Sequence, residues 1–391
     1  MRDVWIRGAA MTRFARYADR TARDLVEEAV AGALSDAQLA AHDIQAAYVG
    51  NATAGLMLGQ ESIRGQVVLR HTGLLGVPIV NVENACAASS TALHLAWHAI
   101  SGGVHECAVV IGYEKLDHRD RGRRAQVVNS TMDLSELAEM FGSGADRVRN
   151  LYLDVLEAGT AGDGRDRFGR DLLAKVAAKN LHHGSLNPLA MRQEAATPEQ
   201  VLSARPFAGQ LTSLMCAPLT DGAACVVLST RDLGRGRPPR VRVSASVLTS
   251  GRGDDMRRRF SVGVTARQAY DLAGVAPGDL DVVELYDQTP IAELTLYEEL
   301  GLCTQGGAGR LVAERATALG GRQPVNTSGG LIARGHAFGA TGVAQVVELT
   351  WQLEDRCGAR QVPGARLALA ENSGGWVGSD VAACCVHVLQ A

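Results

Sequence analysis

The chain has 391 residues, a formal net charge of −3 and a pI of about 6.4. This balance gives no basic surface of the kind that binds nucleic acids or anionic membranes. No stretch approaches the roughly 20 apolar residues of a membrane span, and we expect no signal peptide. The eight cysteines show no C-x-x-C spacing, so the sequence predicts neither a metal site nor a disulfide framework, and it fits a reducing cytoplasm.

A predicted apolar strand at 77–82 leads directly into a helical pattern, and Cys86 lies among small residues at the junction. A strand, a sharp turn and a helix expose a nucleophile and direct the first helical N–H groups at it. Those groups and the helix dipole stabilise a thiolate and, later, an oxyanion. A buried cysteine at a tight packing point is the commoner alternative, and this segment alone does not decide between the two.

The middle of the chain predicts an inserted domain. Residues 115–207 are charged, interrupted by glycine and poorly periodic, and a strand at 223–229 follows them. The segment 232–239 is rich in Gly and Pro and is the best candidate for a linker. We therefore place the first half of the chain at residues 1–232 and the second half at residues 233–391.

The second half contains another Gly-rich turn that opens a helix. Asn326–Gly330 and Arg334–Gly342 precede a predicted helix at 343–353, and they carry His336. A histidine held at such a turn can act as a base or as an oxyanion donor. The turn has neither the G-x-G-x-x-G pattern after a strand nor a Walker lysine, so a nucleotide fold is not indicated.

The two halves repeat one pattern. A shift of 236 positions lays residues 33–49 over residues 269–285, and each copy predicts an amphipathic helix, a short turn and a strand. A shift of 250 lays Cys86 over His336. The shared order indicates a duplicated α/β fold with a pseudo-twofold axis, which would bring the thiol and the imidazole together for nucleophilic acyl transfer.

These motifs resemble the thiolase superfamily, most closely the sterol-carrier-protein-type thiolases. Asn84–Ala87 is similar to the nucleophile motif of that group, and Asn326–Gly330 with Gly335 and His336 is similar to its histidine loop. Further similar segments are 8–14, 179–184 and 217–224. The resemblance implies an α/β thiolase fold, with two similar βαβαβαββ halves in αβαβα layers. It also implies that the inserted loop domain, about 115–207, covers the acyl-CoA entrance.

The resemblance also implies roles for particular residues. Cys86 would attack an acyl-CoA or related thioester, and His336 would activate Cys86 or bind the thioester oxygen. Backbone N–H groups of Cys86 and of the loop formed by Ser373, Gly374 and Gly375 would receive the oxyanion. No cofactor is implied beyond the thioester substrate. A homodimer is implied, and several branches work with a small zinc-ribbon/OB-fold partner protein.

Three positions depart from the pattern of the family. Ala337 replaces the proline that usually follows the histidine. Tyr286 occupies the first position of a motif whose usual His or Asn helps to bind the reacting oxygen, and its hydroxyl can still do so. Asn372 lies where a second Cys or a His usually removes the α-carbon proton, and an amide cannot take up a proton at neutral pH. A standard Claisen condensation or thiolysis is therefore in doubt.

Three functions remain open at this point. The first is an acyltransferase that uses Cys86 to pass an acyl group to an acceptor that needs no strong base, such as an electron-rich phenol ring. The second is a retro-aldolase of the steroid side-chain type, in which tyrosines act on a β-hydroxyacyl-CoA; Tyr286 favours it. The third is a non-catalytic scaffold that binds acyl-CoA or lipid. The intact pair of Cys86 and His336 favours the first.

Overall fold

The computed structural model describes residues 2–133, 135, 168–252, 261–378 and 380–391. Within them, the main sheet has the strand order β3-β2-β4-β7-β1-β8-β11-β10-β9. Its strands are β1 (Val4–Met11), β2 (Ala46–Gly50), β3 (Ile79–Val82), β4 (Cys107–Glu114), β7 (Gly222–Ser229), β8 (Val241–Ser250), β9 (Val282–Glu284), β10 (Leu367–Val377) and β11 (Asp380–Gln390). A small hairpin joins β5 (Pro206–Ala208) to β6 (Leu211–Thr212).

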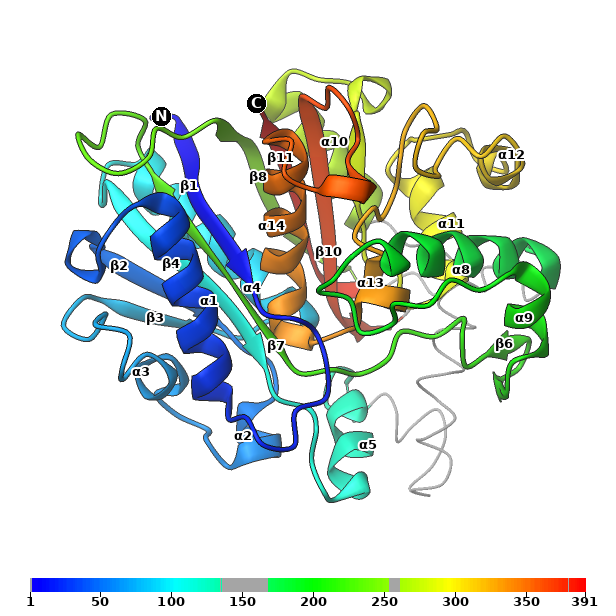
Figure 1. The fold of residues 1–391 in the computed structure, drawn as a ribbon, viewed down its shortest axis with the longest axis horizontal. Coiled ribbons are helices and arrows are strands. Elements are labelled where there is room, and N and C mark those ends of the chain that lie inside the picture. The colour runs from blue at the N-terminus through cyan, green and yellow to red at the C-terminus, as the bar shows by residue number, and fades with distance from the viewer. Residues whose placement is uncertain (1, 134, 136–167, 253–260, 379) are drawn as a thin grey trace.

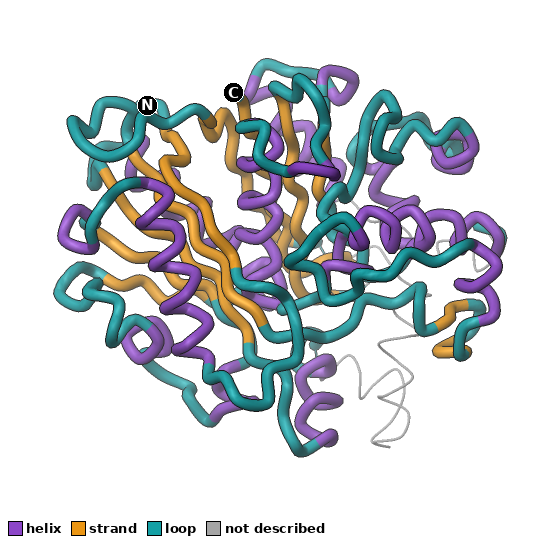
Figure 2. Tube along the Cα trace, in the orientation of Figure 1, coloured by secondary structure: helices purple, strands orange, loops and turns teal. Residues whose placement is uncertain are grey.

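Helices form three layers around the strands. The helices are α1 (Ala22–Ala37), α2 (Ala54–Leu58), α3 (Arg64–Val68), α4 (Ala88–Ser101), α5 (Arg121–Asn129), α8 (Arg170–Ser185), α9 (Pro198–Ser203), α10 (Ser261–Ala273), α11 (Pro290–Glu299), α12 (Ala308–Ala313), α13 (Gly330–Arg334) and α14 (Thr341–Leu353). Helix α1 packs on β1, β4 and β7, and α10 packs on β8 and β11 (Figures 1 and 2). Helices α4 and α14 contact strands of both halves and form the middle layer. This is the predicted αβαβα arrangement of layers.

The strand order shows the predicted duplication. Strands β1 and β8 are neighbours, and outward from them β7, β4 and β2 mirror β11, β10 and β9. A bridge between Val283 and Val325 takes the place of β3 in the second half. Helices α1 and α10 end at Ala37 and Ala273, and strands β2 and β9 begin at Ala46 and Val282. Both pairs are 236 positions apart, as the sequence predicts.

The second predicted register, 250 positions, is wrong. Helix α4 begins at Ala88 and α14 begins at Thr341, which is a difference of 253. In the register of these helices Cys86 corresponds to Gly339, and His336 lies three residues earlier. Both residues still precede the start of a middle-layer helix. The pairing of the thiol with the imidazole therefore comes from neighbouring helix starts and not from strict symmetry.

Helix α14 lies in the middle layer, and this position buries nearly all of its side chains. Every residue of α14 except Trp351 is buried, because strands from both halves of the main sheet pack against the helix. The helix nevertheless contains five buried polar side chains that need internal partners: Thr341, Gln345, Glu348, Thr350 and Gln352. Arg360 gives Glu348 two hydrogen bonds of 2.9 Å, and Gln345 donates to the carbonyl of Glu371 at 2.9 Å. These contacts make a polar helix compatible with the centre of the molecule.

Strand β10 and the predicted insertion at 115–207 differ in how far the structure describes them. The predicted loop of Ser373, Gly374 and Gly375 lies inside one continuous strand, β10. The predicted insertion at 115–207 contains α5, α8, α9 and β5. Its stretch 136–167 lies outside the described residues, so the limits of this domain and of the halves stay predictions. No helix in the described part of the chain is long and apolar enough to cross a membrane.

The close packing of β10 against the nucleophile turn is testable through Gly374. A Cβ atom at this residue would lie 2.4 Å from the Asn84 oxygen and 2.5 Å from the Ala87 nitrogen, both of which are backbone atoms. We expect Gly374→Ala to lower the free energy of unfolding by about 1–3 kcal/mol in denaturant titration. Gly278→Ala, where a Cβ meets no atom within 4 Å, is the control. Equal stability of the two variants would contradict this packing.

Candidate active site

The turn before α4 holds Cys86 in a strained and well-supported position. Ala85, the residue before it, has φ of +47°, which is uncommon for a residue with a side chain. The Ala85 N–H donates to Glu83 Oε1 at 2.7 Å, and the Asn84 amide donates to Thr91 Oγ1 at 3.1 Å. Cys86 therefore lies at the start of the helix, where the unpaired N–H groups and the dipole favour negative charge.

The loop that carries His336 is held by the segment 218–220. The His336 N–H donates to the Pro218 carbonyl at 2.9 Å, and the Thr220 N–H donates to the His336 carbonyl at 3.1 Å. Gly335 has φ of +108°, and a Cβ there would lie 2.6 Å from the Thr220 side chain. Ala337, where the family has proline, has φ of −104°. The two backbone hydrogen bonds supply the rigidity that a proline would otherwise give.

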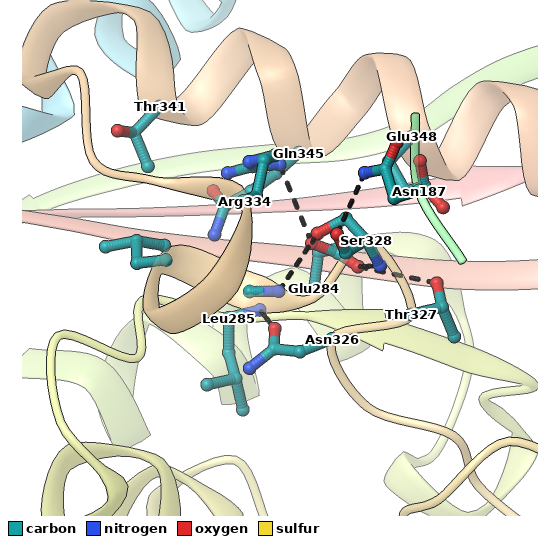
Figure 3. A network of polar contacts seen from close by, with 12 residues as sticks. Asn187, Glu284, Leu285, Asn326, Thr327, Ser328, Arg334, Thr341, Gln345 and Glu348 are labelled. Carbon is teal, nitrogen blue, oxygen red and sulfur yellow. Dashed lines mark hydrogen bonds and ion pairs between the residues drawn. The ribbon is translucent and has the colours of Figure 1, made fainter. Parts of the chain in front are cut away.

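Two buried carboxylates hold the loop that carries His336 in place. Glu284 accepts the N–H of Ser328 at 2.9 Å and its hydroxyl at 2.5 Å, and it lies 3.7 Å from Arg334 (Figure 3). Burial raises the pKa of Glu284 to about 7, and the guanidinium of Arg334 opposes that rise. Asp287 accepts the N–H of Leu331 at 2.7 Å and so caps helix α13. The loop is thereby fixed at both ends of α13.

The starts of the two middle helices are joined directly. Ser89 Oγ of α4 accepts the N–H of Val343 of α14 at 3.1 Å. Glu114, at the end of β4, accepts the N–H of Gly339 at 2.9 Å. Each contact links one half of the chain to the other. These contacts bring the Cys86 turn and the His336 loop to one place.

Tyr286 connects the two predicted catalytic residues. Its hydroxyl lies 3.0 Å from His336 Nε2, and the two rings meet edge to face with centroids 5.2 Å apart. The same hydroxyl hydrogen-bonds the thiol of Cys86 and accepts a hydrogen bond from the amide of Gln288. The structure therefore places the tyrosine hydroxyl between the thiol and the imidazole.

The hydrogen-bond partners indicate where the protons lie. Thr341 Oγ1 is 3.0 Å from His336 Nδ1 and 3.4 Å from the Ala337 carbonyl, which can only accept. The threonine hydroxyl therefore donates to that carbonyl and accepts from Nδ1–H. This leaves Nε2 of His336 without a proton, and it accepts the O–H of Tyr286. Two acceptor positions of the tyrosine oxygen then remain for Gln288 and Cys86.

Burial sets the resting charges of the site. It raises the pKa of the Cys86 thiol to about 12, and the hydrogen bond between the thiol and Tyr286 partly opposes this shift. Burial also lowers the pKa of His336 to about 3, with a smaller contribution from Arg334. The resting site therefore holds a neutral thiol and a neutral imidazole, which is the arrangement that a proton relay requires.

A small pocket opens onto Cys86 and Tyr286, whereas His336 is fully buried behind Tyr286 and does not line it. Its lining includes Cys86, Tyr286, Gln288 and Ser373, with an apolar wall formed by Val262, Ala292, Leu296, Trp376 and Val381. Gly374 and Gly375 also line it, so the predicted binding residues of β10 are at the pocket. Among the described residues, no group of three or more His, Cys, Asp or Glu side chains is placed to hold a metal ion.

Asn372 does not occupy the position that the sequence predicted for it. It does not line the pocket, and both polar atoms of its side chain are buried with no hydrogen-bond partner among the described residues. A Cβ on Gly342 would lie 2.7 Å from its Oδ1, so the amide faces helix α14. Side chains alternate across a strand, which turns Asn372 away while Ser373 points to the pocket. Asn372 therefore stays a predicted site residue that lies next to α14 and does not line the pocket.

The sequence analysis also missed residues of the site. Gln288 and Thr341 hold the tyrosine and the imidazole, and Trp376 lines the pocket. Gln288 lies two residues after Tyr286, in the same motif that departs from the family pattern, and that departure was its only signal in the sequence. No sequence pattern marks a hydroxyl or an aromatic side chain of this kind as part of a site. The roles of Thr341 and Trp376 could therefore be recognised only from the structure.

Comparisons with known proteins agree with this geometry. The chain matches the N-terminal thiolase domain over residues 4–232 and the C-terminal thiolase-like domain over residues 247–387. It is 35% identical to an acetyl-CoA acetyltransferase of Methanothermobacter thermautotrophicus, covering 97% of this chain and 98% of that protein. It is 34% identical to sterol carrier protein 2 of Oryctolagus cuniculus, covering 95% of this chain and 70% of that protein.

Solved structures show the same fold. The Ltp2-ChsH2(DUF35) aldolase superimposes with a TM-score of 0.81 at 21% identity, covering 100% of this chain and 98% of that chain. Human mitochondrial 3-ketoacyl-CoA thiolase superimposes with a TM-score of 0.73 at 19% identity, covering 100% and 99% of the two chains. With both halves matched over most of the chain, this protein belongs to the thiolase family, whose relatives here include acyltransferase-type enzymes and an aldolase.

Proposed function

We propose that this protein is an acyltransferase that takes an acyl group from an acyl-CoA or a similar thioester onto Cys86. The observation that supports it is the hydrogen-bonded line from the Cys86 thiol through the Tyr286 hydroxyl to His336 Nε2, at 3.0 Å for the last step. A thiol beside a relay to a base, at a helix start and in a pocket, is the arrangement of nucleophilic acyl transfer.

In the proposed acylation, two protons move together. The S–H proton of Cys86 passes to the Tyr286 oxygen while the Tyr286 proton passes to His336 Nε2. The thiolate attacks the thioester carbonyl carbon, and the oxyanion is received by backbone N–H groups of Cys86 and of the segment Ser373–Gly375. The bond from that carbon to the CoA sulfur breaks, and the proton returns from His336 to the leaving thiolate. This sequence balances without a cofactor.

We also propose the assembly of the enzyme. Strand β3 ends the described sheet and exposes Val80, and such an edge supports a homodimer formed between core sheets. The structural relative Ltp2 is seen together with ChsH2(DUF35). This relative supports a small zinc-ribbon/OB-fold partner for the present chain. Assays therefore include the protein with and without such a partner.

The relay predicts a specific effect of removing the Tyr286 hydroxyl. We expect Tyr286→Phe to slow acylation of Cys86 by roughly 10²–10⁴-fold, because the proton path to His336 is interrupted. Intact mass spectrometry with a panel of acyl-CoAs measures the adduct, and Cys86→Ala should give none. Tyr270→Phe is the matched control, since that buried hydroxyl donates to the Leu300 carbonyl away from the pocket. An unchanged rate in Tyr286→Phe would refute the relay.

The low pKa of His336 predicts an unusual pH profile. A pKa lowered from 6.5 to about 3 keeps the imidazole unprotonated and able to accept a proton above that pH. We therefore expect the rate of Cys86 acylation to show no acid limb between about pH 5 and about pH 8. Single-turnover acylation across this range is the measurement. A loss of rate centred on the ordinary imidazole pKa would contradict a buried, neutral His336.

A second candidate function is retro-aldol cleavage of a β-hydroxyacyl thioester. The Tyr286 hydroxyl donates to His336, which supports tyrosine as the base for a substrate hydroxyl. The two functions separate cleanly by variant. Cleavage that survives Cys86→Ala but is lost in Tyr286→Phe, with no acyl adduct on the wild type, would establish the aldolase. An adduct on Cys86 that appears with release of CoA would establish the acyltransferase.

A further inference from the structure

A second and larger cavity lies against helix α8, away from the nucleophile. Its volume is about 550 Å³, which is typical of sites that hold a small organic molecule. Residues of α8 form one wall, and residues 312–319, at and after the end of the neighbouring helix α12, form another (Figure 1). No described residue lines both this cavity and the pocket at Cys86.

Helix α11 separates the two spaces. Ala292 and Leu296 of this helix line the active-site pocket. Glu293 and Tyr297, one position further along in each turn, hydrogen-bond the ammonium group of Lys179, at 3.3 Å for the tyrosine hydroxyl. Lys179 belongs to α8 and lines the cavity. The cavity is therefore a site of its own and not an extension of the pocket in which acyl transfer is proposed.

Two basic side chains of the cavity already have partners within the fold. Lys179 is paired with Glu293. His183 Nδ1 donates to the Asn326 carbonyl at 3.0 Å, and its Nε2 accepts the N–H of Leu319 at 3.1 Å. Burial lowers the pKa of His183 to about 3, and the charge of Lys179 adds to this fall. These two residues therefore bring no free charge to the cavity.

Three further basic side chains do remain available. Lys175, His182 and Arg315 line the cavity, are exposed to solvent, and form no ion pair with any described residue. None of the described residues that line the cavity is acidic. A concave surface that carries charge of one sign attracts and concentrates ions of the opposite sign. The cavity therefore favours an anion.

The backbone at Arg315 supports a role for its side chain. Arg315 follows the C-cap residue of α12 and has φ of +53°, a left-handed position at which glycine is the usual residue. The adjacent carboxylate of Glu314 is held by Arg310 at 2.6 Å and by Arg322 at 2.8 Å. The neighbouring acid is thus occupied elsewhere, and the charge of Arg315 is left to the cavity.

We propose that this cavity is a second binding site, for a small molecule that has an apolar body and one anionic head group, either a carboxylate or a phosphate ester. The head group lies by Lys175, His182 and Arg315, and the body covers the apolar part of the lining, which includes Val176 and Leu319. An inorganic anion would leave this apolar lining uncovered. A neutral apolar molecule would leave the cations without a counter-charge.

Calorimetric titration of the whole chain with four probes tests the ligand class. The probes are octanoate, octyl phosphate, octanol and inorganic phosphate. We expect at least one of the two octyl anions to bind at least roughly tenfold more tightly than both octanol and inorganic phosphate, because it alone meets both requirements. The tighter octyl anion identifies the head group. If neither octyl anion binds more tightly than octanol or inorganic phosphate, the proposal is overturned.

Charge reversal locates the bound anion. We expect Lys175→Glu and Arg315→Glu each to weaken binding of the preferred octyl anion by roughly tenfold, because an attraction becomes a repulsion. The matched control is Arg240→Glu, which reverses an exposed cation that does not line the cavity and should leave the affinity unchanged. Both cavity residues are exposed, so their variants are expected to fold.

Hydrogen–deuterium exchange of the wild type gives a second location that needs no variant. The octyl anion should protect amides of α8 and of residues 312–319. Unchanged affinity in both cavity variants, or protection confined to the segments around Cys86, would place the anion elsewhere and overturn the proposal. Binding at this cavity does not depend on acylation of Cys86, so failure of the proposed function and failure of this inference are distinguishable.

Discussion

The meeting of two helix starts in the middle layer is the constraint on which the rest of the site depends. Helices α4 and α14 pack against strands from both halves of the main sheet, and their first turns are joined by the hydrogen bond from Val343 N–H to Ser89 Oγ. Because each helix follows a turn with a reactive side chain, this junction brings Cys86 and His336 together. Small residues make the approach possible, as at Gly112, where a Cβ would lie 2.5 Å from the Gly339 carbonyl oxygen.

Burial gives this junction its electrostatic character. A thiol and an imidazole that were simply paired in a polar site would share a proton and rest as an ion pair. Here desolvation favours the neutral forms of both groups, and the Tyr286 hydroxyl stands between them. Charge then develops only as the reaction proceeds, at a helix start whose N–H groups are already oriented. That is electrostatic preorganisation built from a neutral resting state.

Much of the fold was predictable because it depends on periodicity. The repeat at 236 positions appears in the structure as α1 with α10 and β2 with β9, since hydrophobic spacing and turn residues determine such elements locally. The register at 250 failed because the segment between His336 and the start of α14 is three residues longer than the segment between Cys86 and the start of α4. No local sequence pattern indicates this difference in length. The segment Ser373–Gly375 was predicted as a loop because of its two glycines, yet pairing on either side of Gly375 with β11 makes it part of strand β10.

The sequence by itself determined the two reactive side chains, since Cys86 and His336 each lie in a Gly- and Ala-rich turn before a helix, a local signal. Only the tertiary structure decided what stands around them. The position of Tyr286 between them and the turn of Asn372 toward α14 depend on which face of a strand meets which neighbour. The neighbour that each face of a strand contacts is determined by packing between segments that are distant in the sequence, and no local sequence pattern predicts it.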